Sequence, residues 1–437
     1  MEILRDTYEK LAGEMGDKAV SIIAGPRQTG KTFLLKKLMR EAAAMGKRTA
    51  YYNLELPGDV RLFNGTDEQV FDRLVASGEA VFIDEFHYIK NASKIFKAVY
   101  DSAKPVKIYA SGSSALEIHK HLKESLAGRR WLTRLLPFSY AEFIGKFAGK
   151  RSSAAFNEYT AYGGSPGLLE LPGPDKKINL LNEIYETYIQ KDIKSLIKEE
   201  NIRAFNSLFY LLAENQGSLI SENSLSREVG LTAATINRYL SILEKTYVCY
   251  TVCSYARKLG NELKKSKKVY LYDLGIRNAV LKDFSPCAAR QDKGAVGETF
   301  VLLQLLSVIK PNMEIRFWRN KRGDEIDFVL LKNRKPFIVE VKSSLKSAEI
   351  PKAFSLFIKN YPETAGGMVI SENYSAKSSL LGKEVFFSTF GDFLPQLLKA
   401  IEEPGGGPDP AGNFRQTARR TRRSRSGGKH TAPEFPP

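Results

Sequence analysis

The sequence predicts an α/β protein made of several folded units. Short apolar runs at residues 20–24, 49–53, 80–83 and 106–110 alternate with stretches of helical character. This alternation is typical of a parallel sheet covered by helices on both faces. A similar pattern returns between about residues 290 and 400, where a helical stretch precedes three strand-like runs. A length of 437 residues is enough for roughly three domains.

The composition narrows the class of protein. Apolar residues make up 43% and charged residues 26%, which excludes a collagen, a disulfide scaffold and a wholly disordered chain. No apolar run reaches 18 residues and the first ten residues are too charged for a signal peptide, so we expect a cytoplasmic protein without membrane spans. The net charge of +17 favours a polyanionic partner such as DNA, although many proteins are basic for solubility alone.

Changes in composition divide the chain into five segments. A stretch of helical character at residues 151–217 is interrupted by the sequence Gly163-Gly-Ser-Pro-Gly167. The last segment, residues 404–437, is rich in Gly, Pro, Ser and Arg and is too polar to form a core. That last segment carries a net charge of +5 and is expected to be disordered, either solvated or weakly bound to polyanions. The expected segments are an α/β domain (1–150), a helical linker (151–217), a helix-turn-helix unit with strands (218–283), a second α/β domain (284–403) and a basic tail (404–437).

A phosphate-binding motif follows the first strand-like run. The segment Gly25-Pro-Arg-Gln-Thr-Gly-Lys-Thr32 fits G-x4-G-K-[ST] and lies between a strand and a helix. Backbone N–H groups of such a loop bind phosphates, Lys31 would reach the terminal phosphates, and the Thr32 hydroxyl would ligate Mg²⁺. We therefore expect ATP to contact Gly25, Pro26, Arg27, Gln28, Thr29, Gly30, Lys31 and Thr32.

Two carboxylates end a second apolar strand, in Val81-Phe-Ile-Asp84-Glu85. Asp84 would hold Mg²⁺ through water, and Glu85 would orient and deprotonate the attacking water. The next strand ends at Ser111, which we expect near the γ-phosphate, with Ser113 as the alternative. The aromatic side chains Phe33, Tyr51 and Tyr52 are expected in the core and not against adenine.

The segment Gly128-Arg129-Arg130 offers an arginine for a subunit edge. In a homo-oligomer, Arg129 or Arg130 would stabilise transition-state charge in a neighbouring site. An ion pair with a surface carboxylate is the equally weighted alternative.

These motifs resemble a known family. GPRQTGKT, VFIDEF, YASGSS and LAGRRWLTRLLPFSYAEF occur in the order and spacing of prokaryotic AAA-type ATPases that carry a C-terminal domain of unknown function. YGGSPG, YETYIQKDI and the distal VEVKSS extend the resemblance to about residue 400. It implies an ATP-binding domain. The family commonly has glutamine two residues after the motif glutamate, where this chain has His87, which can still donate a hydrogen bond.

A helix, glycine turn and helix are predicted around Gly230. Thr232 can cap the second helix, and a basic segment at 257–268, with six basic residues and one acid, joins the two strands that follow. This arrangement predicts a winged helix that binds DNA, with packing or protein contact as the alternative use of the fold. The expected core residues are Leu225, Val229, Ile236, Leu240 and Leu243, and the expected recognition residues are Thr235, Asn237, Arg238 and Ser241.

The distal α/β segment carries a carboxylate and lysine constellation. Glu298 lies on a predicted helix, Asp327 on a strand, and Glu340 and Lys342 on one face of the next strand. This order resembles the PD-(D/E)xK core of restriction endonucleases. Asp327 and Glu340 would hold Mg²⁺, and Lys342 would position water for attack on a phosphodiester. The alternative is a solvated ion pair between Lys342 and Glu340 or Asp327.

The sequence thus predicts a Mg²⁺-dependent AAA-type ATPase that binds DNA through a winged helix and carries a nuclease-like domain able to cleave phosphodiesters. Two alternatives stay open. One is an ATP-switched DNA-binding regulator whose nuclease fold is catalytically silent. The other is a protein-interaction switch without a nucleic-acid role.

Overall fold

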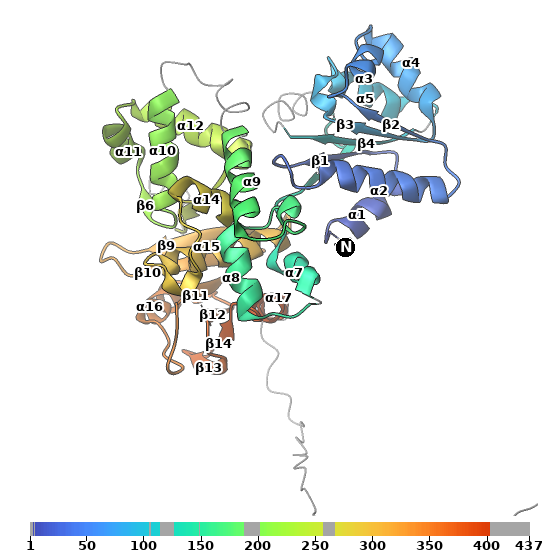
Figure 1. Cartoon of the computed structure of the whole chain (residues 1–437). Coiled ribbons are helices and arrows are strands. Elements are labelled where there is room, and N and C mark those ends of the chain that lie inside the picture. Colours follow the sequence, from blue (N-terminus) through green and yellow to red (C-terminus); the bar gives the residue numbers. More distant parts are fainter. Residues whose placement is uncertain are drawn as a thin grey trace, which may run out of the picture.

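A computed structural model describes most of the chain outside the C-terminal segment. The described residues are 3, 5–104, 106–113, 126–147, 149–187, 202–256 and 267–402. The expected basic tail and most of the expected basic wing (257–266) lie outside them. In Figure 1 the N-terminal sheet lies to one side of a larger body formed by the rest of the described chain.

The N-terminal sheet has five parallel strands in the order β2-β3-β4-β1-β5. Apolar residues on one face pack against α1 and α2, and those on the other face pack against α4 and α5. The prediction of a parallel sheet covered on both faces is therefore confirmed. The elements are α1 (Tyr8–Gly13), η1 (Glu14–Gly16), β1 (Val20–Ala24), α2 (Lys31–Ala44), β2 (Thr49–Asn53), α3 (Pro57–Leu62), α4 (Asp67–Ser77), β3 (Ala80–Asp84), η2 (Phe86–Tyr88), α5 (Ala92–Asp101), β4 (Lys107–Gly112) and β5 (Arg130–Arg134).

A helical region connects this sheet to the larger body. Gly163, with φ of 77°, ends α8, and Pro166 begins η4, so the predicted interruption of the helices is confirmed. Tyr140 in α7 packs edge-to-face on Phe300, with ring centroids 5.2 Å apart, and Figure 1 shows α7 and α8 beside the larger body. The elements are α7 (Tyr140–Phe143), η3 (Ile144–Phe147), α8 (Ser153–Tyr162), η4 (Pro166–Leu168), α9 (Pro174–Thr187) and α10 (Ile202–Glu214).

The helix-turn-helix unit follows α10. Gly230 adopts the left-handed conformation between α11 and α12, and the Thr232 hydroxyl accepts a hydrogen bond from the backbone N–H of Thr235. Four of the five expected core residues are buried in one cluster with α10, and Val229 packs against it partly buried. The elements are β6 (Leu219–Ile220), α11 (Glu222–Val229), α12 (Ala233–Lys245), β7 (Cys249–Ser254), β8 (Lys267–Leu271) and α14 (Leu274–Leu281).

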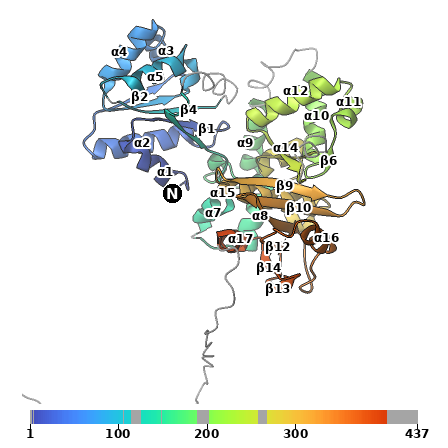
Figure 2. The same ribbon diagram turned by 180° about the vertical axis from the view of Figure 1, so that it is seen from behind.

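A nine-stranded mixed sheet runs through the C-terminal half in the order β13-β14-β12-β11-β10-β9-β7-β8-β6. The parallel pairing of β7 with β9 joins the β7–β8 hairpin to the distal strands, so strands on both sides of the expected 283/284 boundary share one sheet. Figures 1 and 2 show α10, α11 and α12 at one end of this body and β13, β14 and α16 at the other. The remaining elements are η8 (Cys287–Ala289), α15 (Lys293–Val308), β9 (Met313–Arg319), β10 (Glu325–Lys332), β11 (Lys335–Val341), α16 (Lys352–Asn360), β12 (Gly366–Ser371), β13 (Ala376–Leu380), β14 (Lys383–Thr389) and α17 (Phe393–Glu402).

Candidate functional site

The phosphate-binding loop connects β1 to α2. Gly30 has a φ of 89°, a conformation that glycine adopts without steric cost. A Cβ atom at Gly25 would lie 2.0 Å from the carbonyl oxygen of Leu135, so only glycine fits there. The Lys31 Nζ donates hydrogen bonds to the carbonyl oxygens of Gly25 (3.0 Å) and Pro26 (2.7 Å). The lysine ammonium is thus held within the loop by neutral acceptors.

Asp84 lies at the end of β3 and accepts hydrogen bonds from three hydroxyl groups. Thr32 Oγ1 donates to its Oδ2 (2.5 Å), Tyr51 donates to the same atom (3.2 Å), and Ser111 donates to Oδ1. The Ser111 contact arises because β4 pairs with β3, which places the ends of these two strands side by side. The Thr32 hydroxyl and the Asp84 carboxylate together present the hard oxygen ligands that Mg²⁺ prefers. Tyr51 packs against the core cluster of α2 partly buried, and the sequence does not predict that its hydroxyl also reaches Asp84.

Glu85 follows Asp84 with a φ of 54° and turns its side chain toward the end of β4. Its Oε2 accepts hydrogen bonds from the backbone N–H (2.9 Å) and the hydroxyl (3.1 Å) of Ser113, and His87 Nδ1 lies 3.2 Å away. Burial alone would raise the pKa of Glu85, but His87, Lys31 and the Ser113 N–H outweigh it and hold that pKa below its ordinary value. Glu85 is therefore ionised at neutral pH. Ser113, the alternative to Ser111, is the serine that contacts it.

A pocket of about 690 Å³ adjoins the loop. Phe33 is 47% exposed and lines it, so its assignment to the core was wrong. Arg5 also lines the pocket, and it donates to the carbonyl oxygen of Thr29 (3.5 Å) and pairs with Glu142 (3.0 Å). The lining residues are Ile3, Arg5, Thr29, Gly30, Phe33, Arg40, Phe138, Lys146, Pro166, Gly167, Leu169 and Glu170.

The segment Gly163–Gly167 is hydrogen-bonded to the larger body through Asp273. This buried carboxylate accepts hydrogen bonds from the backbone N–H groups of Gly164 (2.9 Å) and Ile276 (3.0 Å), and it caps α14. Burial raises the pKa of Asp273 to about 6, although these hydrogen bonds oppose the shift. A Cβ at Gly163 would lie 2.2 Å from an Asp273 oxygen, so this close approach requires glycine. Asp273 therefore fixes the end of the pocket formed by Pro166 and Gly167 to the start of α14, the helix that follows β8.

The candidate arginines differ in their surroundings. Arg129 Nε pairs with Asp101 (3.0 Å), and its guanidinium lies over the ring of Tyr100. This contact is the surface ion pair that the sequence offered as an alternative. Arg130 begins β5 and is half-buried. The role of either arginine at a subunit edge stays a prediction.

The distal constellation lies in one cluster. Lys342 Nζ pairs with Glu340 Oε1 (2.6 Å), and Asp327 Oδ2 accepts a hydrogen bond from the backbone N–H of Val341 (2.8 Å). Burial and the neighbouring charges of Glu298 and Glu340 raise the pKa of Asp327, and burial also raises the pKa of Glu340. Glu340 Oε2 is buried without a hydrogen-bond partner. The fold thus brings together the four side chains from α15, β10 and the end of β11.

Three further residues complete this cluster. Lys268 Nζ, from β8, lies 2.9 Å from Glu298 Oε1, 2.6 Å from Glu325 Oε1 and 3.8 Å from Asp327 Oδ1. Tyr270 donates a hydrogen bond to the same oxygen of Glu298 (2.5 Å). Lys268 is 1% exposed, so its expected place in a solvated wing was wrong. The sequence did contain a signal for this placement. Lys268 and Tyr270 alternate with the apolar residues Val269 and Leu271, a pattern typical of a strand that has one polar face.

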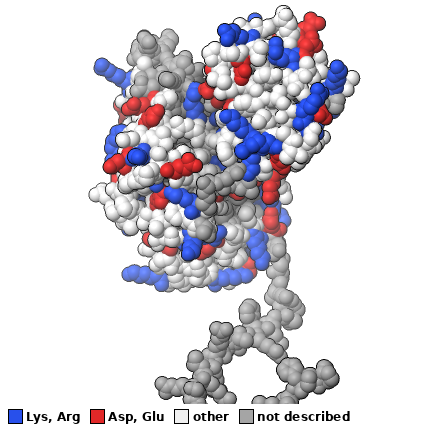
Figure 3. All heavy atoms as spheres, turned by 45° about the vertical axis from the view of Figure 1, so that its right-hand side comes forward, with Lys and Arg blue, Asp and Glu red and all other residues white. Residues whose placement is uncertain are grey.

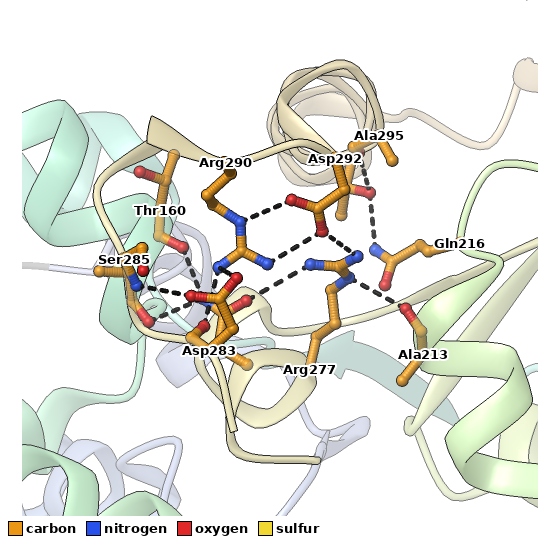
Figure 4. Close-up of polar contacts among 12 residues, drawn as sticks. Thr160, Ala213, Gln216, Arg277, Asp283, Ser285, Arg290, Asp292 and Ala295 are labelled. Atoms are coloured by element: carbon orange, nitrogen blue, oxygen red, sulfur yellow. Dashed lines mark hydrogen bonds and ion pairs between the residues drawn. The ribbon is translucent and has the colours of Figure 1, made fainter. Parts of the chain in front are cut away.

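A buried ionic network fixes the start of α15, the helix that carries Glu298 (Figure 4). Arg277 Nη2 and Arg290 Nε pair with the two oxygens of Asp292, at 2.6 Å and 2.7 Å, and Arg277 also donates to the carbonyl oxygen of Ala213 (3.0 Å). Burial opposes ionisation of Asp292, but the two arginines prevail and lower its pKa to about 2. The helix is thereby fixed to α14 and to the end of α10.

Two features are absent from the described residues. No group of three or more His, Cys, Asp and Glu side chains among them is arranged to hold a metal ion. In the same part of the chain, no helix is both long and apolar enough to cross a membrane.

The expected recognition surface on α12 is partly exposed. Asn237 and Arg238 are exposed, whereas Thr235 and Ser241 are half-buried. Figure 3 shows basic and acidic side chains interspersed over one face of the molecule. The described residues on that face therefore form no broad surface of a single charge.

Comparison with known proteins divides the chain into three matched regions. A family model described as an AAA domain matches residues 17–144. Two models described as domains of unknown function match residues 153–286 (DUF8612) and 293–385 (DUF4143).

Similar proteins occur in bacteria and archaea. An uncharacterized protein of Haemophilus influenzae is 26% identical over 385 residues, covering 83% of this chain and 89% of the relative. Uncharacterized proteins of Mycobacterium tuberculosis (24% identical, 77% of this chain and 73% of the relative) and Methanocaldococcus jannaschii (25%, 78% and 79%) are also similar. The similarity thus spans all three matched regions.

Solved structures resemble the chain only weakly. The replication initiator DnaA bound to AMPPCP and single-stranded DNA has a TM-score of 0.32 and 13% identity, covering 56% of this chain and 90% of that one. The Pif1 helicase of Candida albicans has a TM-score of 0.26 and 12% identity, covering 42% and 48%. These scores are too low to support an argument about function. The AAA match and the strand–loop–helix site assign the N-terminal region to the nucleotide-binding ATPases of the AAA type.

Proposed function

We propose that this protein is a Mg²⁺-dependent ATPase whose nucleotide cycle controls a DNA-binding, nuclease-like body. The nuclease-like part of this proposal rests on one observation. Four side chains lie in one cluster, and one oxygen of Glu340 is buried there without a hydrogen-bond partner. The four residues are Glu298, Asp327, Glu340 and Lys342. A buried carboxylate oxygen without a partner is costly, and a cation at that position would satisfy it.

In the ATP site each residue has a role supported by its contacts. Lys31 would exchange its two backbone carbonyls for terminal phosphate oxygens, and Thr32 and Asp84 would hold Mg²⁺. Glu85, ionised and oriented by Ser113, would accept a proton from the attacking water. The pocket lined by Phe33 has the position and the apolar wall suited to the adenosine.

In the distal cluster, Asp327 and Glu340 would hold a divalent cation, and Glu298, which is paired with Lys268, would act on the bound group once that pair is weakened. Such a cation, when bound, supplies charge neutralisation at a phosphodiester. Lys342, with 46% of its side chain exposed, can reach a water or a phosphate oxygen while it stays paired to Glu340. A buried carboxylate pair with an accessible lysine matches the donor set of phosphodiester chemistry.

Control by ATP is supported by a short structural connection between the sites. Asp273 contacts the segment that borders the nucleotide pocket, and the strand leading to Asp273 carries Lys268 into the carboxylate cluster. A displacement of Gly164 on nucleotide binding would therefore act directly on β8.

DNA binding rests on α12 and the basic segment that precedes β8. Arg238 and Asn237 are exposed on the second helix of the helix-turn-helix unit. Fluorescence anisotropy with labelled duplex DNA should show binding that weakens as salt rises, and Arg238→Ala should weaken it further. Binding that is absent at low salt would contradict this part of the proposal.

A second candidate function is supported by Lys268. Because this lysine already pairs with Glu298 and Glu325, the cluster balances part of its own charge. An ATP-switched DNA-binding regulator with a catalytically silent nuclease fold is consistent with that arrangement.

The deciding experiment incubates the full chain with plasmid and linear DNA in Mg²⁺ or Mn²⁺, with and without ATP. Lys342→Ala should abolish cleavage, and the matched control Lys346→Ala, an exposed lysine nearby, should leave it intact. ATP dependence would establish coupling. No cleavage by a wild-type protein that still hydrolyses ATP would favour the silent fold.

A further inference from the structure

Lys268 occupies an unusual position for a lysine. Its side chain is 2% exposed, and its Nζ lies within 3 Å of carboxylate oxygens of Glu298 and Glu325 and 3.8 Å from Asp327. Buried lysines are rare unless they are paired, and this one pairs with carboxylates from two different elements. The ammonium group therefore lies among the carboxylates of the proposed phosphodiester site.

The charges around it are nearly balanced. The carboxylates are Glu298, Glu325, Asp327 and Glu340, and the cations that contact them are Lys268, Lys342 and Arg319. A divalent cation that entered this cluster would meet a fixed ammonium group at close range, in surroundings where water screens little. Lys268 and the metal ion therefore compete for the same negative charge.

We propose that Lys268 is a built-in counter-cation that sets the affinity of this cluster for divalent metal. The inference rests on the proposed function, because it assumes that Asp327 and Glu340 are the metal-binding carboxylates. Glu298 is turned to Lys268 and Tyr270, which leaves Asp327 and Glu340 as the carboxylates available to a metal ion. Metal then binds only when the pairs of Lys268 with Glu298 and Asp327 are weakened.

The test is calorimetric titration of the full chain with Mn²⁺ alone, without nucleotide and in an Asp84→Asn background that disables the ATP-site ligand. Lys268→Met removes the charge while keeping a long side chain. We expect it to bind Mn²⁺ at least about tenfold more tightly than the parent, since one neighbouring positive charge is removed. Adding Glu340→Gln should abolish this gain. Lys346→Met, at an exposed lysine, should leave the affinity unchanged.

Lys268→Met leaves buried carboxylates unpaired, so its folding needs a safeguard. Lys268→Gln keeps N–H donors for Glu298 and Glu325 without the charge and serves as the second variant. For both variants, thermal unfolding should show a larger upward shift with Mn²⁺ than the parent shows, because the metal replaces the missing cation.

Two results would overturn the inference, and they differ in whether the proposed metal site fails as well. If the parent binds Mn²⁺ through Glu340 and both Lys268 variants bind it with the same affinity, Lys268 does not compete and only the inference fails. If neither the parent nor any variant binds Mn²⁺, the proposed metal site fails together with the inference.

Discussion

The two candidate sites each contain a buried lysine, and the partners of these lysines differ. Lys31 donates to two backbone carbonyls of its own loop, which are neutral acceptors. Lys268 pairs with ionisable carboxylates from α15 and β10. A phosphate can readily outcompete neutral acceptors, whereas a metal ion must displace a charge-assisted contact. The ATP site is therefore ready for its ligand, and the distal site holds a cation of its own.

The first prediction, with the largest effect, tests whether the ATP site is complete. Glu85→Gln should lower ATP hydrolysis by about 10²–10⁴-fold, because it removes the proposed general base, while nucleotide binding is retained. Steady-state hydrolysis and binding of a fluorescent nucleotide measure the two effects. Glu68→Gln, an exposed glutamate on α4, is the control. Undiminished hydrolysis in Glu85→Gln would remove Glu85 from the mechanism.

The second prediction compares the two lysines directly by denaturant unfolding. Lys268→Met should destabilise the fold by about 3–5 kcal/mol, because carboxylates are left buried without their partner. Lys31→Met should cost less, about 1–2 kcal/mol, since the hydrogen bonds lost go to neutral carbonyls and Glu85 keeps its contacts with Ser113 and His87. Equal losses would show that the two lysines are held alike.

The third prediction concerns the connection between the sites. Because the pKa of Asp273 is raised to about 6, the folded protein binds a proton there more tightly than the unfolded chain does. Its contribution to stability is therefore largest below pH 4 and is lost as pH rises from about 4 to 6, by about 3 kcal/mol. Asp273→Asn should flatten this part of the curve in urea unfolding measured against pH. An unchanged slope would assign the pH dependence to other groups.

The fourth and smallest effect concerns His87, the departure from the family pattern. His87 helps to hold the pKa of Glu85 below its ordinary value. His87→Ala should therefore move the acidic limb of the hydrolysis rate to higher pH and leave the rate near pH 8 within a few-fold of the wild type. A limb that stays in place would show that Ser113 and Lys31 alone set the pKa.

Much of the ATP site could be predicted because its residues are local. The loop at Gly25–Thr32 and the Asp84–Glu85 pair are contiguous motifs, and the alternation of strands places Ser111 beside them. Phe33 was misassigned because an aromatic residue in a helix is usually expected in the core. The pocket that it lines is formed with Pro166 and its neighbours, which are distant in sequence, so the sequence alone does not reveal it.

The distal cluster was predicted only in part because it depends on long-range pairing. Glu298, Asp327 and Glu340 follow the order of a known core, but Lys268 reaches them through the parallel contact of β7 with β9. That pairing crosses the expected domain boundary, so no local pattern reveals it. The run of lysines at 264–268 instead suggested a uniformly solvated loop.

Thermal unfolding of the wild-type chain with each ligand alone tests the contrast between the sites most directly. A non-hydrolysable ATP analogue with Mg²⁺ should raise the unfolding midpoint by several degrees, whereas Mn²⁺ without nucleotide should leave it nearly unchanged until Lys268 is replaced. A comparable rise with Mn²⁺ alone in the wild type, lost in Glu340→Gln, would show that the distal site binds metal freely and would contradict the account.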